Sequence, residues 1–372
     1  MASTTIQLGS AVASAGLLAY DIINNDDVYT DDIQKITRGL FSGNAASLAT
    51  FFTSSAQSAS SGQYYYDVYD KVGSDSTREV QFSVAYGHAL GSGSLRINAT
   101  SNFAGSQDTP SRAIYAQYQQ TLLPANTTKF NFIGVGNSAT AGTAGDENSI
   151  YIINFKRARL KDKLDPGNWE LTLRNSTNQI RLIDDSGDSA QISTADQEYY
   201  NVVSGSLSAG IVVPSTTRTY GRVYPKRGVI VLSGTQLDLA APNGISANTT
   251  TTSNTNGNNA FKLFTFISAS AANDSTNGVF KARNLEEVKS SYYFLRVRNS
   301  RFNFSNNPSY IATASNGSLT FSQPTFARDP KTYITTVGLF NDNNEMLAVG
   351  KLSQPILKSY ANEILLKVKL DF

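Results

Sequence analysis

The chain has 372 residues, of which 16% are charged, and its formal net charge is +2. A chain of this length usually forms two domains, and a charge this close to zero excludes a bulk electrostatic attraction to nucleic acid or to an anionic membrane. The sequence has no cysteine and one histidine, His88, which excludes disulfides and the usual zinc and copper sites within one chain.

The N-terminal 62 residues are predicted to form an arm with one short helix. Thr30–Phe41 begins with a threonine that can cap a helix and two acids in the first turn. Ile33, Ile36 and Leu40 follow at helical spacing. Leu8–Tyr20 has the apolar character of a signal peptide but lacks a preceding positive charge and a cleavage site. We expect this small-residue segment to pack against a neighbouring subunit.

Residues 63–245 are predicted to form a β-rich domain with one helix. Tyr64–Tyr69 and Val80–Tyr86 are strand candidates, and the second alternates apolar and polar residues. Asp108–Leu123 is the strongest helix, because Thr109 can cap it and Pro110 occupies its first turn.

The second half of this domain carries turn signals and a buried strand. Asp165–Asn168 is typical of a turn and leads into Trp169, which we expect to anchor the core. Asp184–Asp188 resembles part of a calcium loop, but it lacks the glycine and the closing glutamate of that motif, which favours a solvated hairpin turn. Val229–Leu232 is apolar on both faces and is predicted to be a central strand.

Residues 246–260 are predicted to be an exposed loop or linker, and residues 261–372 a C-terminal β domain. Ser246–Asn259 contains almost no apolar residue and cannot bury surface. Phe261–Ile267 is predicted to be a strand, and Asn284–Val288 carries a variant of a helix capping box. Asn316-Gly317 is the strongest hairpin signal in the chain.

The C-terminal segment predicts a hairpin followed by a last strand. Tyr333–Phe340 and Met346–Leu352 are separated by Asn and Asp residues that tolerate turns, and Pro355 breaks the pattern. Glu363–Phe372 alternates apolar and polar residues, as a half-buried strand does. We expect this strand and the hairpin before it to pack in the core of one lobe. Deletion of Ile364–Phe372 should then give insoluble protein, and soluble, assembling protein would contradict the hypothesis.

From the motifs in this sequence we predict no catalytic, cofactor-binding or metal-binding residues. Gly91–Ser94 lacks the Lys-Ser/Thr of a phosphate loop, and a catalytic triad would have to use His88. Paired carboxylates could serve a glycosidase; the candidates are Asp70, Glu79, Asp162, Asp165, Glu170 and Glu198. Basic residues at Lys156–Lys163 and Arg296–Arg301 favour a solvated edge or an interface with an acidic neighbour over nucleic acid.

The segment ITTVGLFNDNNEMLAVGKLSQPI, followed by ILLKVKLDF, resembles the closing part of tail structural proteins of contractile-tailed bacteriophages. The resemblance is to baseplate and tail-fibre-attachment proteins of T-even-like phages that infect cyanobacteria. The resemblance extends to four further segments, FSVAYG, RAIYAQY, DPGNWELTL and YGRVYPKRGVIVL. None of these patches is a catalytic motif.

The resemblance implies a virion structural protein in the phage tail, assembled in the host cytoplasm. Its expected partners are other tail or baseplate subunits and further copies of itself, with no membrane, nucleic acid or cofactor. A receptor-binding, adhesin-like tail protein, a neck or capsid protein, and a tail enzyme acting on polysaccharide are the alternatives. The fold we predict is mainly β, in several β-sandwich-like lobes with a few short α-helices.

Overall fold

The chain divides into two compact units, which we call the central unit (Lys35–Glu287) and the terminal unit (Met1–Gln34 with Val288–Phe372). Their boundaries lie inside two strands, β3 (Tyr29–Gly39) and β18 (Phe280–Val297). The predicted boundaries near residues 62, 245 and 260 differ from this division, because paired strands and not linkers carry the chain from one unit to the other. The computed structural model describes residues 5–7, 22–23, 29–55, 65–93, 109–135, 142–188, 192–194, 197–249, 259–271, 280–341 and 343–371.

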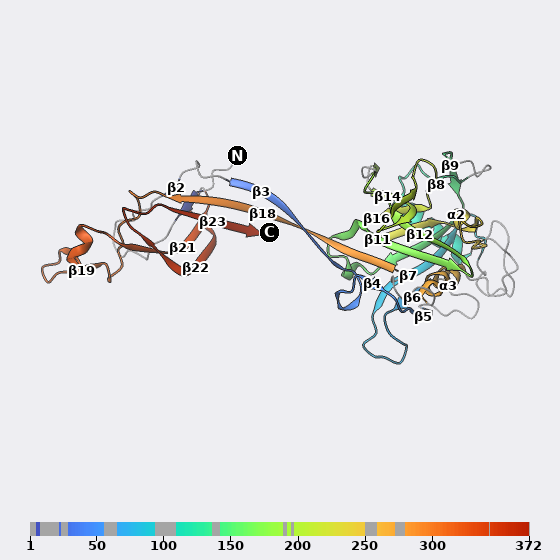
Figure 1. The fold of residues 1–372 in the computed structure, drawn as a ribbon, viewed down its shortest axis with the longest axis horizontal. Helices are drawn as coiled ribbons and strands as arrows, with labels where there is room; N and C mark the ends of the chain where they lie inside the picture. The colour runs from blue at the N-terminus through green and yellow to red at the C-terminus, as the bar shows by residue number, and fades with distance from the viewer. Residues whose placement is uncertain are drawn as a thin grey trace. The chain divides into compact units, whose positions relative to one another are not determined.

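A long antiparallel sheet forms the frame of the central unit (Figure 1). Its strand order is β18-β11-β12-β14-β16-β17-β10-β7-β6-β5. The bounds are β5 (Phe52–Ser55), β6 (Tyr65–Tyr69), β7 (Val80–His88), β10 (Ser149–Phe155), β11 (Lys163–Asn175), β12 (Asn178–Asp184), β14 (Gln197–Ser206), β16 (Gly221–Tyr224) and β17 (Val229–Ser233). Shorter strands are β4 (Ser47–Leu48), β8 (Phe130–Ile133), β9 (Ala144–Glu147), β13 (Ile192–Thr194) and β15 (Gly210–Val213).

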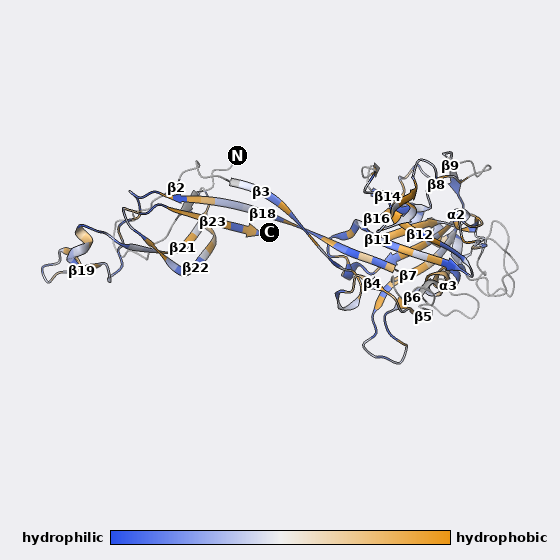
Figure 2. Ribbon diagram, viewed as in Figure 1, coloured by the Kyte–Doolittle hydropathy of each residue, from blue (hydrophilic) through white to orange (hydrophobic). Residues whose placement is uncertain are grey.

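The central sheet is buried on both faces. In β10, Tyr151 and Ile153 join one hydrophobic cluster, whereas Ile150 and Ile152 join another, as the alternation of side chains along a strand requires. Helix α3 (Asn259–Ala271) contributes to the first cluster and α1 (Pro110–Leu122) to the second. The strands accordingly carry long hydrophobic stretches (Figure 2). The prediction that Val229–Leu232 is a central strand is confirmed, since β17 lies between β16 and β10.

The central sheet curves strongly. Phe82 of β7 and Phe280 of β18 are several strands apart in the sheet order, yet their rings meet edge to face with centroids 5.2 Å apart. Trp169 is completely buried in the same cluster, so its predicted role as a core anchor is confirmed. A short helix, α2 (Gly234–Asp238), follows β17.

The terminal unit is built from two small groups of strands. One has the order β2-β1-β21-β22, from β1 (Thr5–Gln7), β2 (Ile22–Ile23), β21 (Thr332–Phe340) and β22 (Met346–Lys358). The other places β18 between β3 and β23 (Ile364–Asp371), as Figure 1 shows. A hairpin of β19 (Ile311–Thr313) and β20 (Leu319–Phe321) flanks Asn316-Gly317, which confirms that hairpin prediction.

A small core joins the two groups of strands. Its buried members are Leu295, Val297, Ile334, Val337 and Leu366. The predicted C-terminal hairpin and last strand are therefore confirmed, and the apolar face of β23 does pack in a core. Proline 355 does not end β22; it lies opposite a register shift, where an edge strand tolerates a residue without an N–H.

Three secondary-structure predictions were wrong. Most of Thr30–Phe41 lies in strand β3 (Tyr29–Gly39) and not in a helix, because this segment pairs with β18. Phe261–Ile267 belongs to helix α3 and not to a strand; a short apolar run fits either structure, and burial against the sheet decides. Asn284–Val288 lies inside β18 and starts no helix.

Other predictions are corrected in detail or lie outside the described residues. Helix α1 is confirmed, but the Thr109 hydroxyl donates to the Gly91 carbonyl at 2.7 Å and does not cap the helix. Asp165–Asn168 forms a bulge within β11. Leu8–Tyr20 and residues 250–258 are outside the described part of the chain, whereas Asn259, at the end of the predicted loop, is buried.

Candidate functional site

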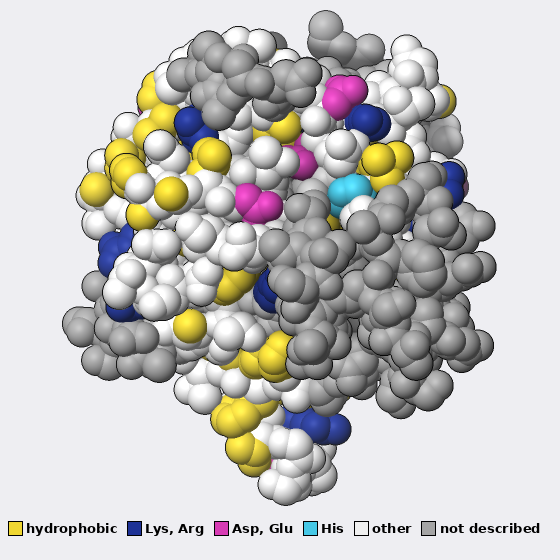
Figure 3. Space-filling model, turned by 90° about the vertical axis from the view of Figure 1, so that its right-hand side faces the viewer, with side chains coloured by type: hydrophobic (Ala, Val, Ile, Leu, Met, Phe, Trp, Pro, Cys, Tyr) yellow, Lys and Arg dark blue, Asp and Glu magenta, His cyan; other side chains and the backbone are white. Residues whose placement is uncertain are grey.

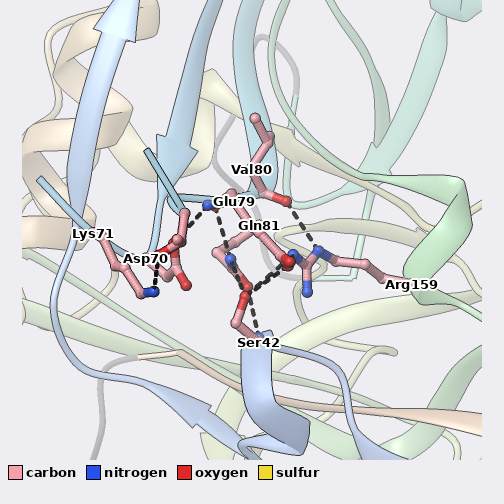
Figure 4. Close-up of polar contacts among 8 residues, drawn as sticks. Ser42, Asp70, Lys71, Glu79, Val80, Gln81 and Arg159 are labelled. Atoms are coloured by element: carbon pink, nitrogen blue, oxygen red, sulfur yellow. Dashed lines mark hydrogen bonds and ion pairs between the residues drawn. The ribbon is translucent and has the colours of Figure 1, made fainter. Parts of the chain in front are cut away.

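One partly buried cluster of polar side chains contains a carboxylate candidate and joins three segments of the central unit (Figure 4). The Arg159 guanidinium donates to the Val80 carbonyl at 2.9 Å and to the Glu79 carboxylate. The Ser42 hydroxyl donates to the same carboxylate at 3.0 Å. The Gln81 amide oxygen accepts from the Ser42 backbone N–H at 3.0 Å, and its nitrogen donates back to the Ser42 hydroxyl at 2.8 Å.

The electrostatics of this cluster favour a structural clamp. Hydrogen bonding to Arg159 and Ser42, with the charge of Arg159, holds the pKa of Glu79 below its usual value. A carboxylate bound in this way stays ionised and is poorly suited to general acid–base catalysis near neutral pH. Asp70 lies beside it and accepts the Glu79 backbone N–H at 2.8 Å. The two candidates therefore lie close together, but they bind the backbone and an arginine.

The aspartates around the β11 bulge also bind backbone. Both oxygens of Asp184 accept the Gly167 N–H at 2.9 Å, which fixes the bulge to the end of β12. Asp185 accepts from the backbone and side chain of Asn201, each at 2.9 Å. Burial raises the pKa of Asp184, although hydrogen bonds from Ser186 and Gly167 oppose the shift. Burial also raises the pKa of Asp165, where a hydrogen bond from Asn168 and nearby positive charges oppose the shift. Among the described residues no group of three or more His, Cys, Asp or Glu side chains could hold a metal ion.

Glu147 is a buried carboxylate that the sequence analysis did not single out. One oxygen accepts the Ser149 N–H at 2.8 Å and the Thr235 hydroxyl at 2.9 Å. The other accepts the Ser233 hydroxyl and the Thr235 N–H. Burial raises its pKa above the usual range, although these hydrogen bonds oppose the shift. No local sequence motif marks the site, because three of its four donor groups belong to Ser233 and Thr235, 86 and 88 positions further along the chain.

His88 is a structural residue. Its Nδ1 accepts the N–H of Leu90 at 3.1 Å and of Ser92 at 3.2 Å, which holds the turn after β7. Burial, aided by the charge of Lys129, lowers its pKa to about 4. The imidazole is therefore neutral at pH 7. In a catalytic triad the Nδ1 nitrogen donates a hydrogen bond to a carboxylate, whereas here it accepts hydrogen bonds from two backbone N–H groups.

The remaining candidate acids and the first basic cluster form ion pairs. Glu170 is buried, accepts the Leu207 N–H at 2.8 Å and lies 3.9 Å from the Lys281 ammonium. The other pairs are Glu198 with Lys226 at 2.7 Å and Lys163 with Glu287 at 2.8 Å.

Asp162 and the second basic cluster follow the same pattern. The Asp162 carboxylate accepts the Glu287 N–H at 2.8 Å, and Arg296 donates to both oxygens of Glu363. On the face drawn in Figure 3, basic and acidic side chains are scattered among uncharged ones. Among the described residues of the face in Figure 3, the basic side chains form no continuous path along which a phosphate backbone could lie.

The most unusual surface lies on the terminal unit. Large apolar side chains of the β21–β22 hairpin are exposed on the face that points away from the core, although soluble monomers rarely gather such residues on one surface. Cross-strand pairing places Tyr333 and Leu357 on this face, and Leu347 and Val349 follow at alternate positions of β22. We call these four residues the apolar surface. Met346, Tyr360 and Leu365 are also exposed on the terminal unit.

Comparison with protein-family models, with curated proteins and with solved structures returned no match to this chain. Among the described residues, no helix is long and apolar enough to cross a membrane. The geometry of the molecule is therefore the basis of the functional proposal.

Proposed function

We propose that the chain is a structural subunit of a tailed-phage virion, in the baseplate wedge or the tail-fibre attachment region, where it acts through protein–protein interfaces. The observation that carries the interface role is the apolar surface of the terminal unit, and the placement in a phage tail follows from the sequence resemblance of the C-terminal segment. Tyr333, Leu347 and Val349 are each more than half exposed, at 61%, 62% and 61%. Burial of such side chains in a subunit interface is favourable by about 25 cal/mol per Å².

The polar clusters of the central unit support the same proposal. The carboxylates of Glu79, Asp184 and Glu147 all accept hydrogen bonds from backbone or from neighbouring side chains. Such contacts stiffen connections between strands, as a load-bearing subunit requires. The sequence pattern of β21, its turn and β22 adds the resemblance to tail proteins described above.

Antibody labelling of purified virions, viewed by electron microscopy, tests the location. Label at the distal end of the tail is the expected result. Label on the head or neck would still support a structural role in the virion, but it would contradict the proposed location in the baseplate or the tail-fibre attachment region. Mass spectrometry of the same particles is the companion measurement, and absence of the chain from virions would overturn the proposal.

A glycan-binding role in host attachment is the second candidate, because two tyrosines are exposed on the terminal unit. Tyr333 is 61% and Tyr360 is 57% exposed, and tyrosine combines an apolar ring with a polar tip. A glycan array probed with the purified protein tests this role. Binding that is lost in both Tyr333→Ala and Tyr360→Ala, and kept in a Tyr65→Ala control on the central unit, would support it. No binding to any glycan would contradict it.

A further inference from the structure

The strand trio β3, β18 and β23 has two open edges in the terminal unit. β18 pairs with β23 in continuous antiparallel register from Ser290↔Asp371 to Val297↔Ile364. β3 pairs with β18, and β23 has no neighbour on its other side among the described strands. The outer edge of β3 is likewise unpaired in the described part of the chain. An open edge presents unpaired N–H and C=O groups to any strand that can approach it.

The two edges carry opposite charges on the same face. Lys367 and Lys369 alternate with the core-facing residues of β23. On β3 the same face carries Asp32 and Gln34, since Gln34 donates to the Tyr292 hydroxyl and accepts from the Lys369 ammonium, both at 3.1 Å. β23 also carries Asp371 beside these lysines, and β3 also carries Lys35 and Arg38 in the part that belongs to the central unit. Within the terminal unit the β23 edge is therefore mainly basic and the β3 edge is acidic.

The basic edge holds a lysine without an acidic partner. The Lys367 ammonium lies over the ring of Tyr292 at 4.2 Å and of Phe294 at 5.6 Å. Within the described residues neither Lys367 nor Asp32 forms an ion pair, whereas Lys369 is 2.9 Å from Asp371. Both unpaired charges are exposed, so both are accessible to a second molecule.

From these observations we propose that copies of this chain associate head to tail, with β3 of one copy added beside β23 of the next. The strand directions allow it, because β3 and β23 both run antiparallel to β18 and hence parallel to each other. The contacts of Asp31 with Ser291 and of Leu40 with Ala282 give the direction of β3. A heterologous contact of this kind closes into a ring when the rotation between copies permits it.

Charge selects this arrangement over a symmetric one. Antiparallel pairing of β23 with β23 of a second copy, centred on Val368, would place Lys367 opposite the partner's Lys369, and like charges across an interface are strongly unfavourable. Pairing β23 with β3 brings Lys367 toward the partner subunit's Asp32 instead. The lysines of β23 thus disfavour pairing with β23 of a second copy and favour pairing with its β3. Such a combination of repulsive and attractive contacts is a common source of specificity. Head-to-tail pairing does not depend on where in a virion the chain belongs.

A charge swap with two full-length variants, Lys367→Glu and Asp32→Lys, tests the proposal. Sedimentation equilibrium over a range of concentrations should show that the unchanged protein associates. Each variant alone places like charges at every contact and should weaken association at least about tenfold. An equimolar mixture should restore it, because one contact regains the unchanged pair and the other gains a reversed pair.

Three outcomes would overturn the proposal. They are a monomer at every concentration of the unchanged protein, a normal association constant for Asp32→Lys, and a mixture no stronger than the separate variants. A symmetric β23 contact would give the second outcome, since Asp32 would then lie away from the interface. Thermal unfolding of each variant confirms that the fold is intact, and Lys226→Glu on the central unit is the matched charge control.

Discussion

The central and terminal units differ in how much of their apolar side-chain surface is buried. The central sheet is covered by apolar clusters on both faces, and these include the largest buried side chains of the chain, Trp169 and Tyr151. The terminal unit has five buried apolar residues in its core. Its exposed large apolar residues are Ile33, Phe304, Leu319, Phe321, Tyr333, Met346, Leu347, Val349, Leu357, Tyr360 and Leu365.

In the described part of the chain the smaller unit therefore exposes more large apolar residues than the larger one, where Tyr65, Val72, Leu90, Leu207, Val212 and Phe261 are exposed. A small unit can bury only a modest fraction of its surface by itself. The difference assigns two tasks: the central unit is stable through its own core, and the terminal unit has apolar surface left for association. Four variants break or sharpen this comparison.

The largest expected effect is on the central core. Trp169→Ala should destabilise the central unit by about 3–5 kcal/mol, because it leaves a cavity in a completely buried site. Chemical denaturation followed by far-ultraviolet circular dichroism measures the change. Val212→Ala is the control, since Val212 is 71% exposed. An equal effect of the two substitutions would show that the central unit does not depend on this core.

The next effect concerns the buried carboxylate. Glu147→Gln should lower the unfolding free energy by about 3 kcal/mol. Each carboxylate oxygen accepts one backbone N–H, so either orientation of the amide places its NH₂ group against an N–H donor that it cannot bind. The fluorescence of Trp169, the only tryptophan, reports unfolding of the central unit. Asp146→Asn is a control on the neighbouring residue. An unchanged unfolding free energy for Glu147→Gln would contradict the role assigned to this carboxylate.

The third effect depends on pH. His88 has its pKa lowered from 6.5 to about 4 in the folded state, so the unfolded chain binds a proton first as the pH falls. Stability is therefore lost on acidification, by about 2 kcal/mol between pH 7 and pH 5. His88→Asn keeps a side-chain acceptor and should flatten the dependence in this range, measured through Trp169 fluorescence. A slope that stays the same would show that another group titrates.

The sequence predicted those elements whose signals are local. Pro110 at the first turn marks helix α1, Asn316-Gly317 marks the β19–β20 hairpin, and the apolar run at Val229–Leu232 marks a central strand. In each case the residues that decide the structure lie inside the element or next to it. The alternation along β23 is a signal of the same kind.

Elements that depend on distant partners were not predictable. Thr30–Phe41 has helical spacing, but pairing with β18, about 250 residues away, makes it a strand. The hydrogen bonds of Glu147 and the contact of Arg159 with Glu79 join residues about 80–90 positions apart. The sequence analysis therefore named Glu79 but did not predict its contacts with Arg159 and Ser42, and it did not identify Glu147 or its hydrogen-bond donors. The open edges of β3 and β23 likewise follow from topology and not from composition.

The smallest effect on stability is expected on the apolar surface. Leu347→Ser combined with Val349→Ser should change the unfolding free energy by no more than about 0.5 kcal/mol, because both side chains are more than 60% exposed on β22. The same variant should bind less of a hydrophobic dye and associate more weakly, since it removes apolar area available to a partner. Ile334→Ser, on the core-facing side of the paired strand β21, is the matched control and should destabilise strongly. A large loss of stability for the β22 variant, with dye binding unchanged, would place these side chains in the core and remove the distinction between the two units.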